Sequence, residues 1–275
     1  MIRLNDSIGY VLDVDASKVI EAVRSTGVTV TPAMMHYAHY LISNMKNIGT
    51  WQLCNAVYGF VGGTAASHKF NWKDLRDVDA AFRLIFSNVT HSSLGIITSG
   101  AADGSSYADT KLIPSTTLTV DNNHMSSYVT QNVAGTYLMG AIDDTTNQFQ
   151  NLTLANRIGS IGIFGSTGAG NADRILTIAS SNITGFNLGS KNGSALYQLN
   201  KQQFLTITTT QDLGSNILPT FSIWIGGLQR QIVSPNPYAS ANTFNFSSVG
   251  GAISTTQAIQ QSQIVTNAQA ILNRA

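Results

Sequence analysis

Ser126-Ser-Tyr-Val-Thr130 and Thr136-Tyr-Leu-Met-Gly-Ala-Ile142 are two short runs rich in β-branched and aromatic residues. Such runs favour strands. Similar runs recur at intervals of about 8–15 residues, with Gly, Asn, Asp and Ser between them, and this spacing is typical of a sandwich or jelly roll. The other predicted strands are 80–86, 116–120, 160–164, 176–178, 204–208 and 221–225. Hairpin connections are expected at 143–147 and 191–194, where turn-forming residues gather.

Helical periodicity appears on both sides of this β region. Pro32 suits a first helical position with Thr31 as its cap, and apolar residues from Met35 to Met45 share one face. Near the end of the chain, Ser254 caps a segment with an apolar stripe. The residues between the apolar positions are Gln and Asn instead of charged residues. The sequence therefore predicts helices at 32–48 and 254–273, the second packed on the sheet or on a neighbouring subunit.

Residues 1–31 look like a separate N-terminal docking segment. Within it, 9–15 alternate like a strand, and 16–24 have helical spacing that stops near Gly27. Residues 32–275 are predicted to form one domain. The expected fold class is mainly β, a sandwich or jelly roll with an N-terminal helix and a C-terminal amphipathic helix.

The composition argues for a protein that displays a surface and associates with copies of itself. Glu21 is the one Glu of the chain, and charged residues make up 11% of it, against about a quarter in typical soluble proteins. Glycosidases of this fold class carry paired carboxylates along a strand, and Asp77-Val-Asp79 is the nearest match. We interpret this pair as a turn or strand-entry network, and we expect a non-enzymatic protein.

Charge and cysteine content narrow the expected partners. The net charge of +1 with no basic stripe argues against nucleic acid. No apolar stretch is long enough to predict membrane insertion, and the first residues show no signal peptide. Cys54 stands in an apolar context and is expected to be a buried small hydrophobe. His36 and His39 are three apart on the first predicted long helix, and we expect a buried or interface pair there rather than a metal site.

The candidate ligand-binding residues are an aromatic residue and a polar loop. Tyr107 stands beside a Ser-rich segment, and Asp143, Asp144 and Asn147 share one predicted loop; these four residues are the predicted glycan site. We expect no cofactor, but hard cations prefer clustered oxygen ligands, so Asp143 and Asp144 are the first candidates if Ca²⁺ binds.

The tryptophans and a glycine-rich segment have structural interpretations that involve no ligand. Trp51, Trp72 and Trp224 are interpreted as core or interface anchors. The glycines between 159 and 170 lack the Gly-Lys-Ser/Thr ending of a phosphate-binding loop, so a hairpin of small residues is the better interpretation.

Six strings along the chain carry a resemblance to one group of proteins: 47–51 (NIGTW), 57–71 (VYGFVGGTAASHKFN), 77–86 (DVDAAFRLIF), 90–95 (THSSLG), 107–110 (YADT) and 272–274 (LNR). Together they resemble phage and phage-derived virion proteins with a concanavalin A-like (laminin-G-like) domain. The resemblance spans roughly 33–275 and is most specific over 58–71. It implies a two-sheet jelly roll used for display or glycan contact, and it supplies no catalytic residues.

Composition and resemblance together predict a bacteriophage virion protein, a fibre, spike or head or tail decoration subunit, made in the host cytoplasm. Its expected partners are other virion proteins, copies of itself, most often in a trimer, and a host-surface polysaccharide. Two alternatives remain open at this point. One is a stand-alone carbohydrate-binding module, and the other is a capsid or tail scaffold without a ligand.

Overall fold

The structure is a computed structural model, and it describes the following residues: 11–100, 105–131, 136–143, 150–157, 160–161, 184–193, 195–200, 203–208, 218–230 and 240–274.

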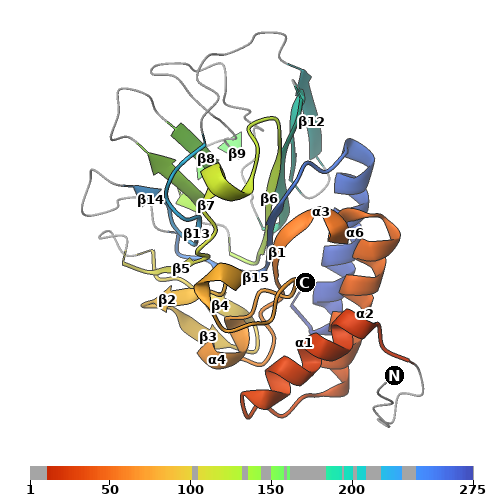
Figure 1. Cartoon of the computed structure of the whole chain (residues 1–275). Coiled ribbons are helices and arrows are strands. Elements are labelled where there is room, and N and C mark those ends of the chain that lie inside the picture. Colours follow the sequence, from red (N-terminus) through yellow and green to blue (C-terminus); the bar gives the residue numbers. More distant parts are fainter. Residues whose placement is uncertain are drawn as a thin grey trace.

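Two β-sheets form a sandwich, and a layer of helices covers one of them (Figure 1). All strand pairs are antiparallel in the described part, except β14 beside β7. The first sheet has the order β12 (Gln203–Thr208), β11 (Ala195–Asn200), β10 (Gly185–Asn192), β6 (Asn122–Val129), β15 (Thr243–Gly250), β4 (Gly95–Ile97) and β3 (Thr90–Ser92), with β1 (Cys54–Tyr58) also paired to β15. The second sheet has the order β2 (Ile85–Ser87), β5 (Tyr107–Asp109), β13 (Trp224–Ile225), β7 (Thr136–Asp143), β8 (Gln150–Arg157) and β9 (Ser160–Ile161), with β14 (Gln229–Arg230) beside β7.

Strand β6 shows why the first sheet has a core on each side. Successive side chains of a strand point to opposite faces. Met125 and Val129 face the second sheet, while Tyr128 faces the helices, and all three are buried. One hydrophobic cluster therefore fills the space between the sheets, and another fills the space between the first sheet and the helices.

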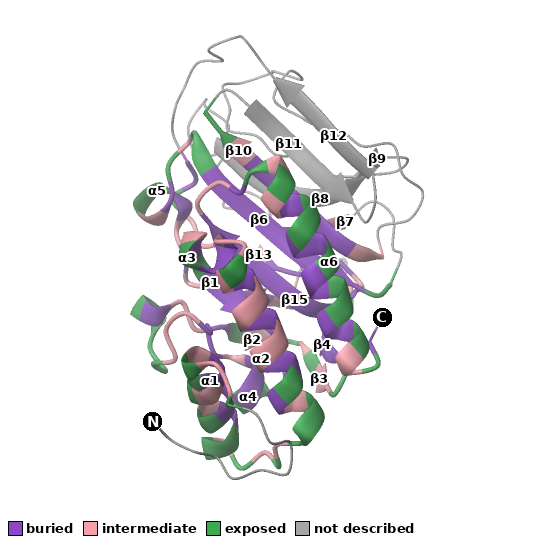
Figure 2. Cartoon of the chain, turned by 90° about the vertical axis from the view of Figure 1, so that its right-hand side faces the viewer, coloured by how far each residue is buried: buried purple, intermediate pink, exposed green. Residues whose placement is uncertain are grey.

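The helical layer consists of α1 (Val14–Ser25), α2 (Pro32–Asn47) and α6 (Thr255–Ile271). Figure 2 shows these helices in front of the first sheet, with their exposed sides turned away from it. Short helices α3 (Thr50–Leu53), α4 (Ala65–His68) and α5 (Pro114–Thr117) and a 3₁₀ turn at Asp79–Ala81 lie in the connections. The expected fold class, a mainly β two-sheet sandwich with helices near both ends, is confirmed.

The caps of the long helices are those expected from the sequence. The Thr31 hydroxyl accepts the Met34 amide at 3.3 Å at the start of α2. Ser254 accepts the Gln257 amide at 3.3 Å, and the Gln257 side chain accepts the Ser254 amide in return. Each cap satisfies amides that the helix itself leaves without partners.

The N-terminal segment differs from the predicted strand. Helix α1 already begins at Val14, with the Asp13 carboxylate accepting the Asp15 amide at 2.9 Å. Ala16, Val19 and Ile20 are buried in the same hydrophobic cluster as α2. The division of the chain at residue 31 stays a prediction.

Several predicted strands are confirmed and others are not. β6, β7 and β12 match the expected runs, and β10 and β11 turn at Gly193, whose φ is 60°. Residues 80–86 are not a full strand, because a 3₁₀ turn and a left-handed Phe82 (φ 58°) precede β2. Residues 116–120 begin instead within α5, where Pro114 occupies the first turn. In 221–225 only Trp224–Ile225 pairs. The predicted strand at 176–178, and 162–164 of another, lie outside the described residues.

No helix in the described ranges is both long enough and apolar enough to cross a membrane.

Candidate functional site

Two aromatic rings stand on the outer face of the second sheet. Ala108 of β5 and Ile225 of β13 point into the core, so the alternate residues Tyr107 and Trp224 point outward. Their rings are parallel to within 1° with centroids 3.5 Å apart, and both are partly exposed. Stacked rings on a sheet face offer apolar surface at low conformational cost, since the sheet fixes both backbones.

An ion pair lies beside these rings. The Asp109 carboxylate, opposite Trp224 in the register, binds the Lys111 ammonium at 2.8 Å and accepts the Lys111 amide at 2.9 Å. The hydrogen bond from the Lys111 ammonium to the Asp109 carboxylate is the main cause of the raised pKa of Lys111. Lys111 has a left-handed backbone (φ 58°), a conformation that costs free energy for a residue with a Cβ. The pair thus fixes a donor and an acceptor next to the aromatic surface.

Two further features leave room for hydrogen bonding there. Gly140 of β7 is opposite Trp224, so the neighbouring strand places no side chain on this face at that position. The indole nitrogen of Trp224 is buried and has no hydrogen-bond partner among the residues that the structure describes. We call Tyr107, Trp224, Asp109 and Lys111 the aromatic face. Chemically, it can stack on an apolar ring face while binding hydroxyl groups at its side.

The carboxylates Asp77 and Asp79 form an ion-pair network, as expected. Arg83 binds Asp77 at 3.0 Å and Asp79 at 2.9 Å, and Lys69 also binds Asp77. The hydrogen bond from Lys69, followed by that from Arg83, lowers the pKa of Asp77. A carboxylate held ionised in this way is a poor general acid.

The predicted site residues are only partly placed by the structure. Tyr107 lies on the aromatic face. Asp143 ends β7, opposite Gln150, and β13 separates β7 from the strand of Tyr107. Asp144 and Asn147 lie outside the described residues, so this loop, as a glycan or calcium site, stays a prediction.

Trp224 is not the core anchor that was one of its two interpretations, and its role as an interface anchor stays a prediction. Ile223 and Ile225 are fully buried on either side of it, whereas Trp224 is partly exposed. The apolar alternation within 221–225 was the signal that could have placed Trp224 on the outer face. Trp51 and Trp72, by contrast, are buried in the cluster under the helices.

Metal ligation finds no support in the part of the chain that the structure describes, where no three His, Cys, Asp or Glu side chains come together. His39 accepts the Asp13 amide at 2.9 Å and so helps to begin α1. Cys54 is buried, as expected, and burial raises the pKa of its thiol to about 12. Such a thiol is unreactive at neutral pH.

Comparison with known proteins gives a likeness of fold. No protein-family model matches the chain, and no curated protein sequence matches it. The Trypanosoma rangeli sialidase, solved in complex with sialic acid, aligns over 80% of this chain with a TM-score of 0.50 and 10% identity. The chain spans 33% of that sialidase's length.

Two carbohydrate-binding structures align less well. They are the CBM40 domain of a Ruminococcus gnavus sialidase (TM-score 0.38, 15% identity, 51% of this chain and 82% of that one) and domain 4 of the Geobacillus stearothermophilus arabinanase AbnA (TM-score 0.44, 13% identity, 76% and 98%).

The sialidase comparison contradicts the expectation of a non-enzymatic protein, because the fold is shared with an enzyme chain. The composition argument was wrong in its premise. It tested only for a pair of carboxylates, and not all glycosidases depend on such a pair. A single Glu therefore does not define the class of this protein.

Proposed function

We propose that this protein binds glycans through the aromatic face of its second sheet. The observation that carries the proposal is the outward-facing, parallel stack of Tyr107 and Trp224 beside the Asp109–Lys111 pair. The sandwich fold shared with a sialidase that was solved with sialic acid is consistent with it.

Each residue has a separate role in this proposal. The aromatic pair supplies apolar surface for the C–H face of a sugar ring. Asp109 accepts hydrogen bonds from hydroxyl groups, and Lys111 donates to them, while the hydrogen bonds between these two residues hold both side chains in place. The unpartnered indole N–H of Trp224 is a further donor once a ligand or a side-chain shift reaches it.

The test is binding of the full chain to an array of neutral and acidic oligosaccharides, followed by calorimetric titration of the best ligand. Tyr107→Ala and Trp224→Ala are each expected to weaken binding at least tenfold, or about 1.4 kcal/mol. Ile259→Ala, an exposed apolar residue on α6, is the matched control and should bind like the wild type. Equal affinity of all variants would show that the ligand binds elsewhere.

A virion display role is the more specific form of this proposal. The strings that resemble phage virion proteins contact one another although they are far apart in sequence: Arg274 donates to the carbonyl groups of Phe60 (2.8 Å) and Ser93 (2.8 Å), and the Tyr58 hydroxyl donates to Phe82 (2.7 Å). These contacts support the idea that the resemblance belongs to one structural unit.

The expected assembly follows from display. Repeated copies turn weak single-site affinity into useful avidity, so we expect a homotrimer. Light scattering of the purified full chain measures its mass in solution. A trimer supports a virion subunit, whereas a monomer that still binds glycan favours a stand-alone binding module.

A further inference from the structure

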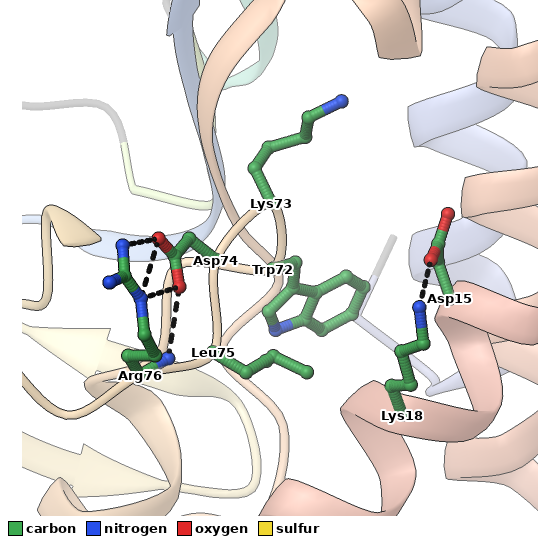
Figure 3. Close-up of a pocket in the computed structure, with 7 residues that line it drawn as sticks. All are labelled: Asp15, Lys18, Trp72, Lys73, Asp74, Leu75 and Arg76. Atoms are coloured by element: carbon green, nitrogen blue, oxygen red, sulfur yellow. Dashed lines mark hydrogen bonds and ion pairs between the residues drawn. The ribbon is translucent and has the colours of Figure 1, made fainter.

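A cleft separates α1 from the loop that follows β1, on the opposite side of the first sheet from the aromatic face. Its volume is about 430 Å³, within the range of small-molecule sites. Figure 3 shows Asp15 and Lys18 of α1 on one side and Trp72, Leu75 and the loop on the other. Segments more than 50 positions apart in the sequence therefore form its two walls.

Trp72 provides the apolar wall and a hydrogen-bond donor. Only 3% of the residue is exposed, because its ring packs against Gly59 and Tyr37. Its backbone amide donates to the Val57 carbonyl at 2.8 Å, and its indole nitrogen is not one of the buried polar atoms that lack a partner among the described residues. Figure 3 shows the indole nitrogen on the side of Leu75, which also lines the cleft. The indole N–H can therefore donate to water or to a ligand in the cleft.

The charges around the cleft favour an anionic ligand. Its lining has one more cation than carboxylates, with Lys18, Lys73 and Arg76 against Asp15 and Asp74. Asp74 is bound on both oxygens by the Arg76 side chain, and Lys73 donates to the Trp51 carbonyl at 2.6 Å. Within the described ranges, Lys18 pairs with Asp15 at 3.2 Å, and its side chain is 62% exposed. An ammonium has three donors, so Lys18 retains unused ones.

The same lining also suits hydroxyl groups. Each oxygen of Asp15 accepts one cation, Lys18 on one and Lys46 at 2.7 Å on the other, and each keeps a second lone pair. Inorganic phosphate would use the free donors but neither the Asp15 acceptors nor the apolar surface of Leu75. A carboxylated sugar uses all three.

We propose that this cleft is a second binding site, selective for a carboxylate-bearing saccharide. The carboxylate accepts hydrogen bonds from Lys18 and the Trp72 indole, the hydroxyl groups donate to Asp15, and the apolar face of the saccharide lies against the partly exposed Leu75. Arg76, 70% exposed, adds positive charge at the rim. This site is independent of the aromatic face.

The test uses the full-length, ¹⁵N-labelled chain titrated with a galacturonic acid trisaccharide, with a neutral galactose trisaccharide as comparison. The sequentially assigned Trp72 indole resonance is expected to shift with the acidic ligand alone. Lys18→Gln and Arg76→Gln change exposed side chains, so the fold should persist, and each should weaken binding at least tenfold. Lys191→Gln, whose partner is Asp121, is the matched control and should leave affinity unchanged.

Three results would overturn the proposal: no shift of the Trp72 resonance at high acidic saccharide, equal affinity of Lys18→Gln and wild type, or equal binding of the neutral saccharide at this resonance. Tyr107→Ala separates the two sites. Loss of acidic-saccharide binding in Tyr107→Ala but not in Lys18→Gln would place the ligand on the aromatic face and reject the cleft. Retained binding in Tyr107→Ala with loss in Lys18→Gln supports the cleft, whatever the outcome for the aromatic face.

Discussion

Gly59 lies where the chain passes directly against the indole of Trp72. A Cβ at this position would be 2.1 Å from two carbon atoms of that ring, far inside contact distance. Trp72 is packed in the core and cannot move away without disturbing Tyr37. We therefore expect Gly59→Ala to lower the free energy of unfolding by about 1–3 kcal/mol, measured by urea denaturation.

Gly227→Ala is the matched control for Gly59→Ala. A Cβ at Gly227 would meet its nearest neighbour, the Tyr107 Cβ, at 3.6 Å, an ordinary contact. Its unfolding midpoint should stay close to that of the wild type. Similar midpoints for the two variants would show that the close approach at Gly59 relaxes without cost.

The contacts of Arg274 give a structural reason why the last residues of the chain are part of the sequence resemblance. Its guanidinium is nearly buried and donates to the carbonyl groups of Ser93 and Phe60, both within the resembling strings. Burial lowers the pKa of Arg274, but the side chain still ties the end of α6 to the glycine-rich string. The side chain of Arg274 thus joins segments that are about 180 and 215 positions away in the sequence.

The packing of helix α1 determines whether the N-terminal segment is independent of the sandwich. Ile20 is fully buried in the cluster that also contains Trp51 and Trp72. Ile20→Ala is expected to cost about 2–5 kcal/mol of unfolding free energy, because it leaves a cavity in this cluster. Tryptophan fluorescence during urea denaturation reports the loss.

Val14→Ala is the control on the same helix, since Val14 is 62% exposed and its truncation removes little buried surface. If residues 1–31 were a detachable docking segment, Ile20→Ala would leave the fluorescence transition in place. A shift in Ile20→Ala without one in Val14→Ala shows that α1 is part of the folded core.

Acid stability is a property of the whole molecule. Burial lowers the pKa of His68 from 6.5 to about 3, with the nearby His91 and Arg274 adding to the effect, and burial lowers that of His124 from 6.5 to about 4. Both side chains stay neutral in the folded protein while the unfolded chain takes up protons below pH 6.5. Stability is therefore complete above pH 6.5 and falls between 6.5 and about 4, by roughly 1.4 kcal/mol per pH unit for each His.

Urea midpoints at pH 7.5, 5.5 and 4.5 measure this dependence. His124→Asn should flatten the slope of stability against pH, even if it lowers stability at every pH. Val14→Ala alters an exposed side chain that does not titrate and should keep the wild-type slope. Identical slopes for the wild type and His124→Asn would mean that the pKa of His124 is the same in the folded and unfolded states.

The sequence predicted those elements whose stabilising groups lie close together in the chain. Helices α2 and α6 were found because their caps and apolar periodicity involve residues three or four positions apart. β6 and β7 were found from their composition. Residues 80–86 were mistaken for a strand because Tyr58, 24 positions away, binds the Phe82 carbonyl, and Arg83 binds the neighbouring carboxylates.

Of the candidate site, the sequence alone predicted Tyr107 as a ligand-binding residue, which stays a prediction, and local alternation around Ile223 and Ile225 contained the signal for the outward position of Trp224. What only the tertiary structure decided is that these two rings stack. They are 117 positions apart, and they meet because β5 and β13 become neighbours in the second sheet. Caps and periodicity act over one helical turn or one strand and are therefore visible in the sequence. Strand order and the walls of the cleft depend on how distant segments share one core, which no local pattern specifies.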